Sequence, residues 1–348
     1  MKTDGLLKEC ECAVVTSPAS LYYLSGFDQS DAVILLTKEQ NYYITNPLYE
    51  VAVKSSLKGD FIVKILDRRE QTSFIREILG TASTVGVECD HLTLTAYHLL
   101  LGELNCRPID ISSHLKGMRA VKTDAELGCI KLAEGMVDDA FHEILPLLRI
   151  GVTEREIKDK LLFALLARGA EGVAFDTIVA FGENAAMPHA VSSDRPLKQG
   201  DCILMDFGAK YRGYCSDFTR TVCCGAPSDA FRAAYEDVLN AQRAAIAYIE
   251  RGGRSASEAD KSARAVIDSG RYQGLFRHTL GHGVGIEIHE APYLSEKSED
   301  LLQEHAVFTL EPGIYVEGAF GIRIESLVAI ENGKLTVIDR SDKEIYTV

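Results

Sequence analysis

The sequence predicts a two-domain protein of the α+β and α/β classes, with a small α/β domain followed by a larger, pseudo-twofold domain. Its 348 residues exceed what one compact core usually holds, which predicts two domains. Short β-rich runs alternate with helical runs in the first third, as in an α/β domain. The later order is helix, helix, hairpin, helix, helix, hairpins, which is one αα-ββ unit written twice. We therefore expect domains at residues 1–118 and 119–348.

The composition is that of an ordinary soluble globular protein, with 46% hydrophobic and 25% charged residues. The net charge of −14 argues against nucleic acid as a partner, because phosphate binding needs a basic surface. We expect no signal peptide in residues 1–26, since Lys8, Glu9 and Glu11 interrupt the apolar runs, and we expect no membrane span, since no stretch is apolar for the necessary length. The nine cysteines include no C-x-x-C pair. We expect a cytoplasmic protein with reduced thiols and no membrane partner.

The first domain alternates strands, which are enriched in β-branched and aromatic residues, with helices. The predicted strands are Asp31–Thr37, Asn41–Thr45 and Phe61–Leu66, and the predicted helices are Glu50–Leu57, Ser73–Leu79 and Leu94–Leu104. This domain contains no nucleotide-binding fingerprint and no catalytic cluster. We therefore expect its histidines, His91, His98 and His114, to be structural.

The second domain begins with helices that have clear start signals. Thr123–Glu126 and Thr153–Glu156 are capping boxes, in which a threonine hydroxyl and a glutamate each satisfy a free amide at a helix start. The predicted helices run from these boxes to Leu148 and Gly169, from Ser228 to Ile249, and from Ser257 to Gly270. The predicted strands are Thr177–Phe181, a hairpin from Cys202, Glu287–His289, Ala306–Leu310, Gly313–Glu317, Gly321–Ile330 and Leu335–Ile338. A pseudo-twofold sheet with four helices on one face would follow.

The stretch Asp206–Thr221 contains two aspartates in a strand-like context. If it is a hairpin that turns at Tyr211 and Arg212, Asp206 and Asp217 lie opposite each other, with Cβ atoms roughly 5 Å apart. Carboxylates at that separation repel each other and need a cation, either one metal ion or a pair about 3.5 to 4 Å apart. The alternative is a surface hairpin with two unrelated acids.

A second pair of acids, Glu311 and Glu325, lies in strand-like stretches near the end of the chain. A three-residue turn at Glu317–Ala319 places them opposite each other, although Pro312 and Gly313 disturb the ladder beside Glu311. The sequence thus predicts two hairpins that each contribute a pair of carboxylates.

Residues 277–290, R-H-T-L-G-H-G-V-G-I-E-I-H-E, bring together His278, His282 and His289. The glycines among them argue against a regular helix and favour a turn in which an imidazole approaches an ion closely. A phosphate-binding G-x-G-x-G loop is the alternative, but the strand-then-helix context of that motif is missing. With His282, the four carboxylates suit two ions of Mn²⁺, Co²⁺, Fe²⁺ or Zn²⁺, and the carboxylate majority favours Mn²⁺.

Together these motifs resemble the pita-bread metallopeptidases and, within them, the Xaa-Pro peptidase branch of aminopeptidase P and prolidase. The resemblance covers Met118 to Val348, and the preceding residues are similar to the creatinase-type amino-terminal domain of that branch. It implies five metal ligands, Asp206 and Asp217 in D-F-G-x8-D-F-T-R-T, His282 in G-H-G-V-G, Glu311 in L-E-P-G and Glu325 in G-I-R-I-E. It also implies that His189 in P-H and His289 in I-H-E bind substrate and stabilise the tetrahedral intermediate, and that His278 and Arg323 are further active-site residues.

The resemblance implies hydrolysis of Xaa-Pro bonds, in dipeptides or at the N-terminus of longer peptides, by a hydroxide that bridges two divalent ions. Glu311 would pass a proton to the leaving proline nitrogen, and His289 would donate to the oxyanion. A homodimer is expected from the family. Ser326 departs from the pattern, because the family usually has an acid after this glutamate, so a contact made by that acid beside the ligand is not expected here.

Other functions remain open from the sequence. Methionine aminopeptidases share the five ligands but usually lack the amino-terminal domain and the G-I-R-I-E ending, and creatinase shares the fold without the metal set. A binding module on the same fold would have lost ligands, and none is missing here. The D-F-G tripeptide also occurs in protein kinases, but the H-R-D loop and the V-A-I-K lysine are absent. The motifs do not distinguish a dipeptidase from an aminopeptidase that takes longer peptides.

Overall fold

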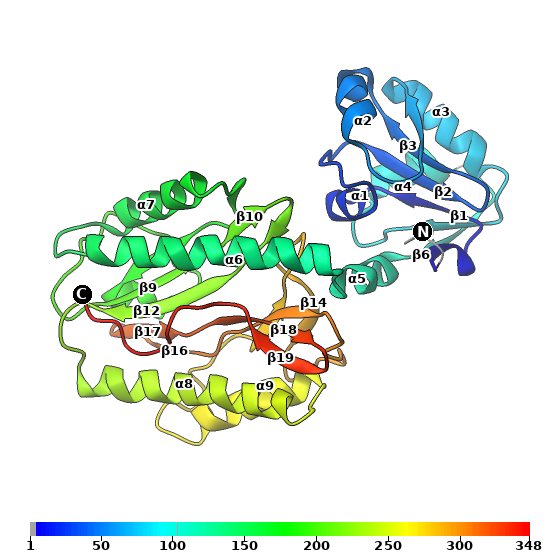
Figure 1. The fold of residues 1–348 in the computed structure, drawn as a ribbon. Coiled ribbons are helices and arrows are strands. Elements are labelled where there is room, and N and C mark those ends of the chain that lie inside the picture. Colours follow the sequence, from blue (N-terminus) through cyan, green and yellow to red (C-terminus); the bar gives the residue numbers. More distant parts are fainter. Residues whose placement is uncertain (1–4, 103) are drawn as a thin grey trace. The chain divides into compact units, whose positions relative to one another are not determined.

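The computed structural model describes residues 5–102 and 104–348 (Figure 1). By its internal contacts the chain forms two compact units, Met1–Arg119 and Ala120–Val348. Within the described residues, none of the helices has the length and apolar character needed to cross a membrane.

The first unit is built on a six-stranded sheet with the strand order β4-β3-β2-β1-β5-β6. Its strands are β1 Cys12–Val15, β2 Val33–Thr37, β3 Asn41–Thr45, β4 Ile62–Ile65, β5 Thr84–Val87 and β6 Arg107–Asp110. Its helices are α1 Pro18–Ser25, α2 Glu50–Ser56, α3 Arg68–Leu79, α4 Leu94–Leu101 and α5 Ser112–Ala120. Ala13 and Val15 of β1 belong to one buried cluster, whereas Cys12 and Val14 belong to another. Because successive side chains of a strand point to opposite faces, both faces of this sheet are covered.

The predicted strands and helices of this unit are confirmed, with shifts at their ends. The helix predicted from Ser73 begins earlier, at Arg68, because Asp67 and Glu70 form a capping box there. The short elements β1, β5, β6, α1 and α5 have no counterpart among the predicted elements.

The second unit contains the helices α6 Asp124–Ile144, α7 Glu154–Ala167, α8 Asp229–Glu250 and α9 Ala256–Asp268. Both predicted capping boxes, at Thr123 and Thr153, are present, and Ser228 caps α8 as predicted. The start predicted for the last helix is wrong by two residues. Ser255, rather than Ser257, accepts the hydrogen bond from the Glu258 amide and begins α9.

The strands of the second unit form several small sheets instead of the single sheet predicted. They are β7 Gly172–Val173, β8 Ile178–Phe181, β9 Cys202–Phe207, β10 Ala209–Tyr211, β11 Tyr214–Cys215, β12 Phe218–Cys223, β13 Gly281–Gly283, β14 Glu290–Leu294, β15 Val307–Leu310, β16 Gly313–Val316, β17 Phe320–Arg323, β18 Ser326–Glu331 and β19 Lys334–Val337. The sheets have the orders β11-β10-β7, β12-β9-β8, β14-β13-β15-β18-β19 and β16-β17. The strand predicted at Glu287–His289 is wrong, because the chain pairs with β13 only from Glu290.

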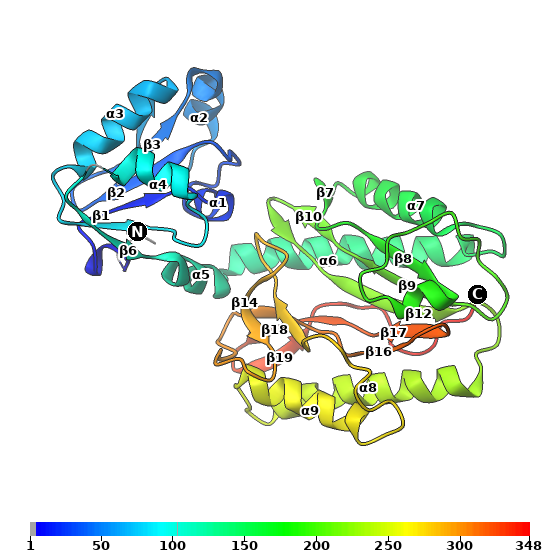
Figure 2. The same ribbon diagram turned by 180° about the vertical axis from the view of Figure 1, so that it is seen from behind.

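The strands lie between two pairs of helices, α6 with α7 and α8 with α9 (Figure 1 and, from behind, Figure 2). The prediction of four helices on one face is therefore wrong. Ile203, Met205 and Phe207 of β9 pack in the core that includes α6 and α7, whereas Cys202 and Leu204 belong to the core of α8 and α9. By this alternation the side chain of residue 206 points away from α6 and α7, towards the middle of the unit.

Candidate active site

The first hairpin turns one residue later than predicted. Arg212 and Gly213 form its two-residue turn with positive φ angles of 47° and 74°, between the partners Tyr211 and Tyr214. Two-residue turns of this primed type match the twist of the strands and need positive φ angles, which glycine adopts easily. Gly213 therefore suits this position. The predicted pairing of the two aspartates is therefore wrong, because Asp206 faces Thr219 instead of Asp217.

The two aspartates nevertheless converge, because the hairpin is interrupted on both sides. Gly208 separates β9 from β10, and Ser216 and Asp217 separate β11 from β12. A Cβ atom on Gly208 would lie 2.0 Å from the carbonyl oxygen of Ser216, so glycine permits the close approach of the two strands here. One carboxylate oxygen each of Asp206, Asp217 and Glu325 lie within 4.8 Å of one another.

The second hairpin has the predicted register. Val316 pairs with Phe320 across the three-residue turn, and Gly313 pairs with Arg323. The same register continues after an interruption, where Leu310 pairs with Ser326. Glu311 and Glu325 occupy opposite positions in this interruption, so the prediction that they face each other in the register is confirmed.

His282 lies on a short strand, β13, and not on the predicted turn. Its glycine neighbours are needed for close packing, because a Cβ on Gly281 would lie 2.1 Å from the Thr309 oxygen and one on Gly283 would lie 2.1 Å from the Ala291 oxygen. The Nε2 atom of His282 is 3.5 Å from Asp217 Oδ2 and 3.3 Å from Glu311 Oε1. All five residues predicted to bind metal thus meet at one place.

The orientation of the His282 ring suits metal binding. Its Nδ1 atom is 3.1 Å from the carbonyl oxygen of Gly283, to which it donates a hydrogen bond. In the neutral imidazole this leaves the Nε2 lone pair directed at the carboxylates, as in metal-binding histidines whose other nitrogen donates to a carbonyl.

The carboxylates are held in an environment that needs positive charge. Burial and the charges of Glu325 and Asp206 raise the pKa of Asp217 well above its ordinary value. Burial is also the main cause that raises the pKa of Asp206 and of Glu325. Without metal, burial opposes ionisation of Glu311, but a hydrogen bond from Nε2–H of the protonated form of His282 and nearby positive charges lower the pKa of Glu311 to about 2.

Two oxygens of this group, Asp206 Oδ1 and Glu325 Oε1, are buried and accept no hydrogen bond from the described residues. Buried polar atoms are almost always paired, so these oxygens lack the partner that a cation would provide. Oxygen and imidazole donors are those that Mn²⁺, Fe²⁺, Co²⁺ and Zn²⁺ accept. The residues present therefore fit divalent metal.

A chain of hydrogen bonds connects the predicted residues Arg323 and His278. Arg323 contacts Asp206 and donates from Nη1 to Tyr315 Oη at 2.6 Å. The same hydroxyl is 2.8 Å from His278 Nε2, while His278 Nδ1 is 2.9 Å from the carbonyl oxygen of Thr279. Since Nδ1 donates to that carbonyl and burial lowers the pKa of His278, Nε2 of the neutral ring accepts the hydrogen bond from Tyr315. Tyr315 has no sequence signal of its own, because a tyrosine in a strand is typical of a core residue.

His189 and His289 are exposed and line the cavity that four of the predicted metal ligands also line, and its volume is about 480 Å³. The ring centroids of His282 and His289 are 4.2 Å apart in an edge-to-face arrangement. The cavity also contains residues that sequence reasoning missed: Phe175, Asp176, Ile178, Pro188, Thr279, Ile288 and Tyr293. Eight of the nine predicted site residues line it, and the ninth, Glu325, is buried beside Asp206 and Asp217.

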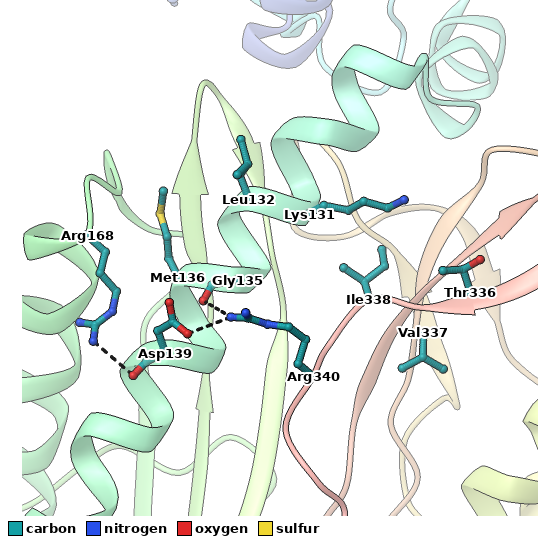
Figure 3. A pocket seen from close by; sticks show the side chains of 10 residues that line it. All are labelled: Lys131, Leu132, Gly135, Met136, Asp139, Arg168, Thr336, Val337, Ile338 and Arg340. Atoms are coloured by element: carbon teal, nitrogen blue, oxygen red, sulfur yellow. Dashed lines mark hydrogen bonds and ion pairs between the residues drawn. The ribbon is translucent and has the colours of Figure 1, made fainter.

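A larger hollow of about 650 Å³ lies between α6 and residues 336–340 (Figure 3). Its charged side chains are engaged with one another or with neighbours: Arg340 with Asp139 at 2.8 Å, Lys131 with Glu331 at 2.7 Å and Arg168 with Glu143 at 2.6 Å. Since the titratable groups here are paired and do not converge, the smaller cavity is the candidate active site.

Comparison with known proteins shows the family of the chain. Residues 128–332 match the model of metallopeptidase family M24, and residues 7–121 match the creatinase/prolidase N-terminal domain. The chain is 36% identical over 332 residues to the Xaa-Pro dipeptidase of Pyrococcus furiosus, an alignment that covers 94% of this chain and 93% of the relative.

Solved structures of related proteins are similar to this fold over almost the whole chain. The crystal structure of X-Pro aminopeptidase from Thermotoga maritima has a TM-score of 0.90 and 35% identity, with 99% of each chain covered. Xaa-Pro dipeptidase from Bacillus anthracis has a TM-score of 0.92 and 34% identity, covering 100% of this chain and 98% of the other. The predicted fold class and family are confirmed. The protein belongs to metallopeptidase family M24 and carries, before its peptidase domain, an amino-terminal domain of the creatinase/prolidase type.

Proposed function

We propose that the protein is an Xaa-Pro peptidase that uses two divalent ions, Mn²⁺ by preference, held by Asp206, Asp217, His282, Glu311 and Glu325. The observation that carries the proposal is the convergence of Asp206, Asp217 and Glu325 within 4.8 Å, where Asp206 Oδ1 and Glu325 Oε1 are buried without a hydrogen-bond partner among the described residues. The carboxylate majority among the five donors supports Mn²⁺. The names of the relatives, which are an X-Pro aminopeptidase and Xaa-Pro dipeptidases, support the substrate class.

The side chains of the site have distinct tasks in this proposal. When bound, divalent ions lower the pKa of water and polarise a carbonyl group. Glu311 lines the cavity as a carboxylate beside His282, so it is suited to accept a proton from the attacking water and to deliver it to the leaving proline nitrogen. Thr309 donates to Glu311 Oε1 at 3.1 Å and helps to fix this carboxylate.

The exposed imidazole of His289 is suited to donate a hydrogen bond to the oxyanion that forms on the scissile carbonyl. His189 lines the same cavity and, with His278 and Arg323, borders the space for the substrate. The apolar side chains of Phe175, Ile178 and Ile288 also line this space, and an apolar wall suits a proline ring.

A comparison of three peptides tests the proposal. With Mn²⁺ present, the protein is expected to hydrolyse Ala-Pro, Ala-Pro-Ala or both, and to leave Met-Ala-Ser almost uncleaved. The ratio of the first two rates distinguishes a dipeptidase from an aminopeptidase. Rapid cleavage of Met-Ala-Ser with Ala-Pro-Ala untouched would indicate a methionine aminopeptidase, and no turnover of any peptide would indicate a binding module.

A further inference from the structure

The ladder of the second hairpin stops where Glu311 and Glu325 lie, so the backbone there needs other partners. Regular pairing ends at Leu310 with Ser326 and resumes at Gly313 with Arg323. The amide of Glu311 donates to the Leu280 oxygen at 2.8 Å, and the amide of Glu325 donates to the Thr219 oxygen at 3.2 Å. Buried backbone carbonyls need partners as well, and a strand that leaves its ladder loses them.

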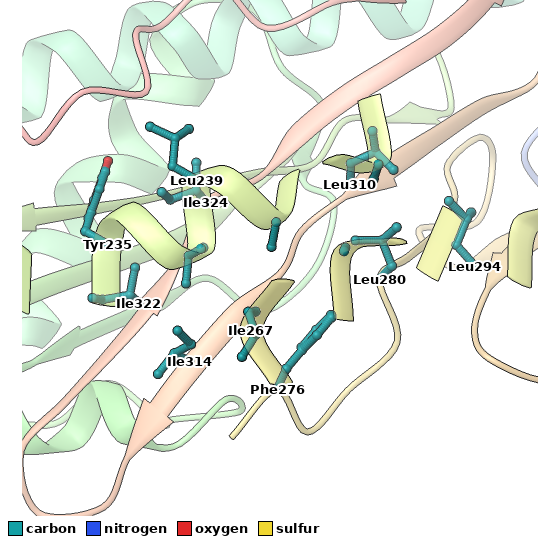
Figure 4. Packing of buried hydrophobic residues seen from close by; sticks show 14 of the residues in the cluster. Tyr235, Leu239, Ile267, Phe276, Leu280, Leu294, Leu310, Ile314, Ile322 and Ile324 are labelled. Carbon is teal, nitrogen blue, oxygen red and sulfur yellow. The ribbon is translucent and has the colours of Figure 1, made fainter. Parts of the chain in front are cut away.

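One side chain of α8, Gln242, supplies partners to both interrupted strands. Its Nε2 atom donates to the carbonyl oxygen of Leu310 at 2.9 Å and to that of Ile324 at 3.0 Å. These two carbonyls belong to the residues immediately before Glu311 and Glu325. Figure 4 shows Leu310 and Ile324 in the apolar core, where the α8 residue Leu239 also lies.

The surroundings of Gln242 make an amide an expensive choice at this position. Gln242 is completely buried, and its helix neighbours Val238, Ala241 and Ala245 belong to the apolar core. Its Oε1 atom accepts no hydrogen bond from the described part of the chain. A buried amide with an unpaired oxygen costs free energy that an apolar side chain would not cost. The role of Gln242 is therefore to give the two buried carbonyl oxygens the hydrogen bonds that a leucine or methionine could not donate.

We propose that Gln242 is a positioning residue that fixes the separation of Glu311 and Glu325 and thereby the affinity of the site for metal. This inference rests on the proposed function, because it assumes that both glutamates bind metal. The amide group has two hydrogens on one nitrogen, so a single planar group holds the two carbonyls at a fixed distance. Glu311 and Glu325 directly follow the residues that carry these carbonyls. The separation of the two carbonyls therefore helps to set the separation of the two carboxylates.

The test compares metal binding in three variants of the full-length, metal-stripped protein by isothermal titration with Mn²⁺. Gln242→Met removes both donors at similar length, and we expect Mn²⁺ affinity to fall by about 10- to 100-fold, as for other residues that orient metal ligands. Gln242→Asn keeps the amide but withdraws it by one methylene group, so its donors reach the two carbonyls less well and we expect an intermediate loss of Mn²⁺ affinity. Ile249→Ala is the matched control, because Ile249 lies on the same helix in the same core.

The control separates positioning from general loss of stability. Ile249→Ala is expected to lower the melting temperature at least as much as Gln242→Met, yet to leave Mn²⁺ affinity within about twofold of the wild type, because it leaves every metal-binding group in place. Equal affinities of the Gln242 variants and the wild type would overturn the inference while leaving the proposed function intact. A wild-type protein that binds no Mn²⁺ would overturn the proposed function and this inference together.

Discussion

Tyr315 connects two residues of the site through one hydroxyl group. It is almost fully buried, accepts a hydrogen bond from Arg323 and donates one to His278. Replacing it by phenylalanine leaves a guanidinium N–H and an imidazole nitrogen without their partner inside the site. Because Arg323 in turn contacts Asp206, the loss of this hydroxyl is expected to reach the metal-binding group.

For Tyr315→Phe we expect kcat/KM for Ala-Pro to fall by about 10- to 100-fold, measured by steady-state kinetics with saturating Mn²⁺. Tyr235→Phe is the matched control, because Tyr235 is equally buried but donates to backbone oxygens of Lys343 and Glu344 outside the site. That control should keep kcat/KM within about twofold of the wild type, since its hydroxyl contacts no residue of the site. Equal activity of both variants would show that the Tyr315 hydroxyl has no role in the reaction.

At this scale the sequence predicts residues with unusual chemistry and misses those with ordinary chemistry. Acids in strand-like runs, such as Asp206 and Glu325, and histidines among glycines, such as His282, stand out against the pattern expected of a core. Tyr315 and Gln242 do not, because their roles depend on which carbonyl or side chain the fold brings to them. Ser326 is buried and its hydroxyl has no hydrogen-bond partner among the described residues, so the departure seen in the sequence leaves no polar contact there.

Among the elements, β13 depends on the absence of side chains at two of its three residues, Gly281 and Gly283. A Cβ on Gly283 would lie 2.1 Å from a backbone oxygen of β14, which cannot move without displacing that strand. Gly128, in the second turn of α6, has no atom of another element within 4 Å of its Cβ position among the described residues. The two glycines therefore predict opposite effects of the same substitution.

Gly283→Ala is expected to lower the free energy of unfolding by about 1–3 kcal/mol and to weaken Mn²⁺ binding, because β13 carries His282. Gly128→Ala is expected to raise it by about 0.5–1 kcal/mol through its greater helix propensity. Urea unfolding followed by circular dichroism measures both, since the chain contains no tryptophan to report by fluorescence. A Gly283→Ala protein as stable as the wild type would contradict the packing described for β13.

The two hairpins show which part of an element's register can be predicted. In the second hairpin, the position of the three-residue turn at Glu317–Ala319 was enough to predict which residues face each other. Both strands keep one register on either side of the interruption. In the first hairpin Arg212 has a positive φ angle, which is unusual for a residue other than glycine, asparagine or aspartate. The position of that turn depends on the primed geometry and was missed by one residue, while the interruption that brings Asp217 inward left no signal.

At the scale of the whole second unit, Arg220 ties the site to the end of the chain. All five N–H groups of this fully buried guanidinium are used. Four of them donate to backbone carbonyl oxygens, those of Thr219 at 3.0 Å, Glu325 at 2.5 Å, Ser341 at 2.8 Å and Asp342 at 3.1 Å. The fifth donates to the carboxylate oxygen Oδ2 of Asp339 at 2.7 Å. The C-terminal segment is held in turn by Asp138 of α6, which accepts from the amide and the hydroxyl of Ser341. Motifs give no indication of such a contact, because it joins residues more than a hundred positions apart.

Arg220→Met is expected to lower the free energy of unfolding by about 3–5 kcal/mol, because it removes five buried donors from their acceptors and leaves the buried Asp339 carboxylate to the partly exposed Lys343. Arg155→Met, on α7 of the same unit, removes an exposed ion pair with Asp194 and is expected to change the free energy of unfolding by less than about 1 kcal/mol. Urea unfolding of the metal-free proteins compares the two. Similar losses of unfolding free energy in both variants would contradict the stabilising role described for Arg220.

The central claim is that metal held by Asp206, Asp217, His282, Glu311 and Glu325 is required for Xaa-Pro hydrolysis. The most direct measurement is the rate of Ala-Pro hydrolysis while Mn²⁺ is titrated into protein stripped by a chelator, with Asp217→Ala in parallel. The account predicts no turnover without metal, recovery that saturates near two Mn²⁺ ions per chain, and no recovery in the variant. Undiminished hydrolysis by the stripped protein, or wild-type rates for Asp217→Ala, would contradict it.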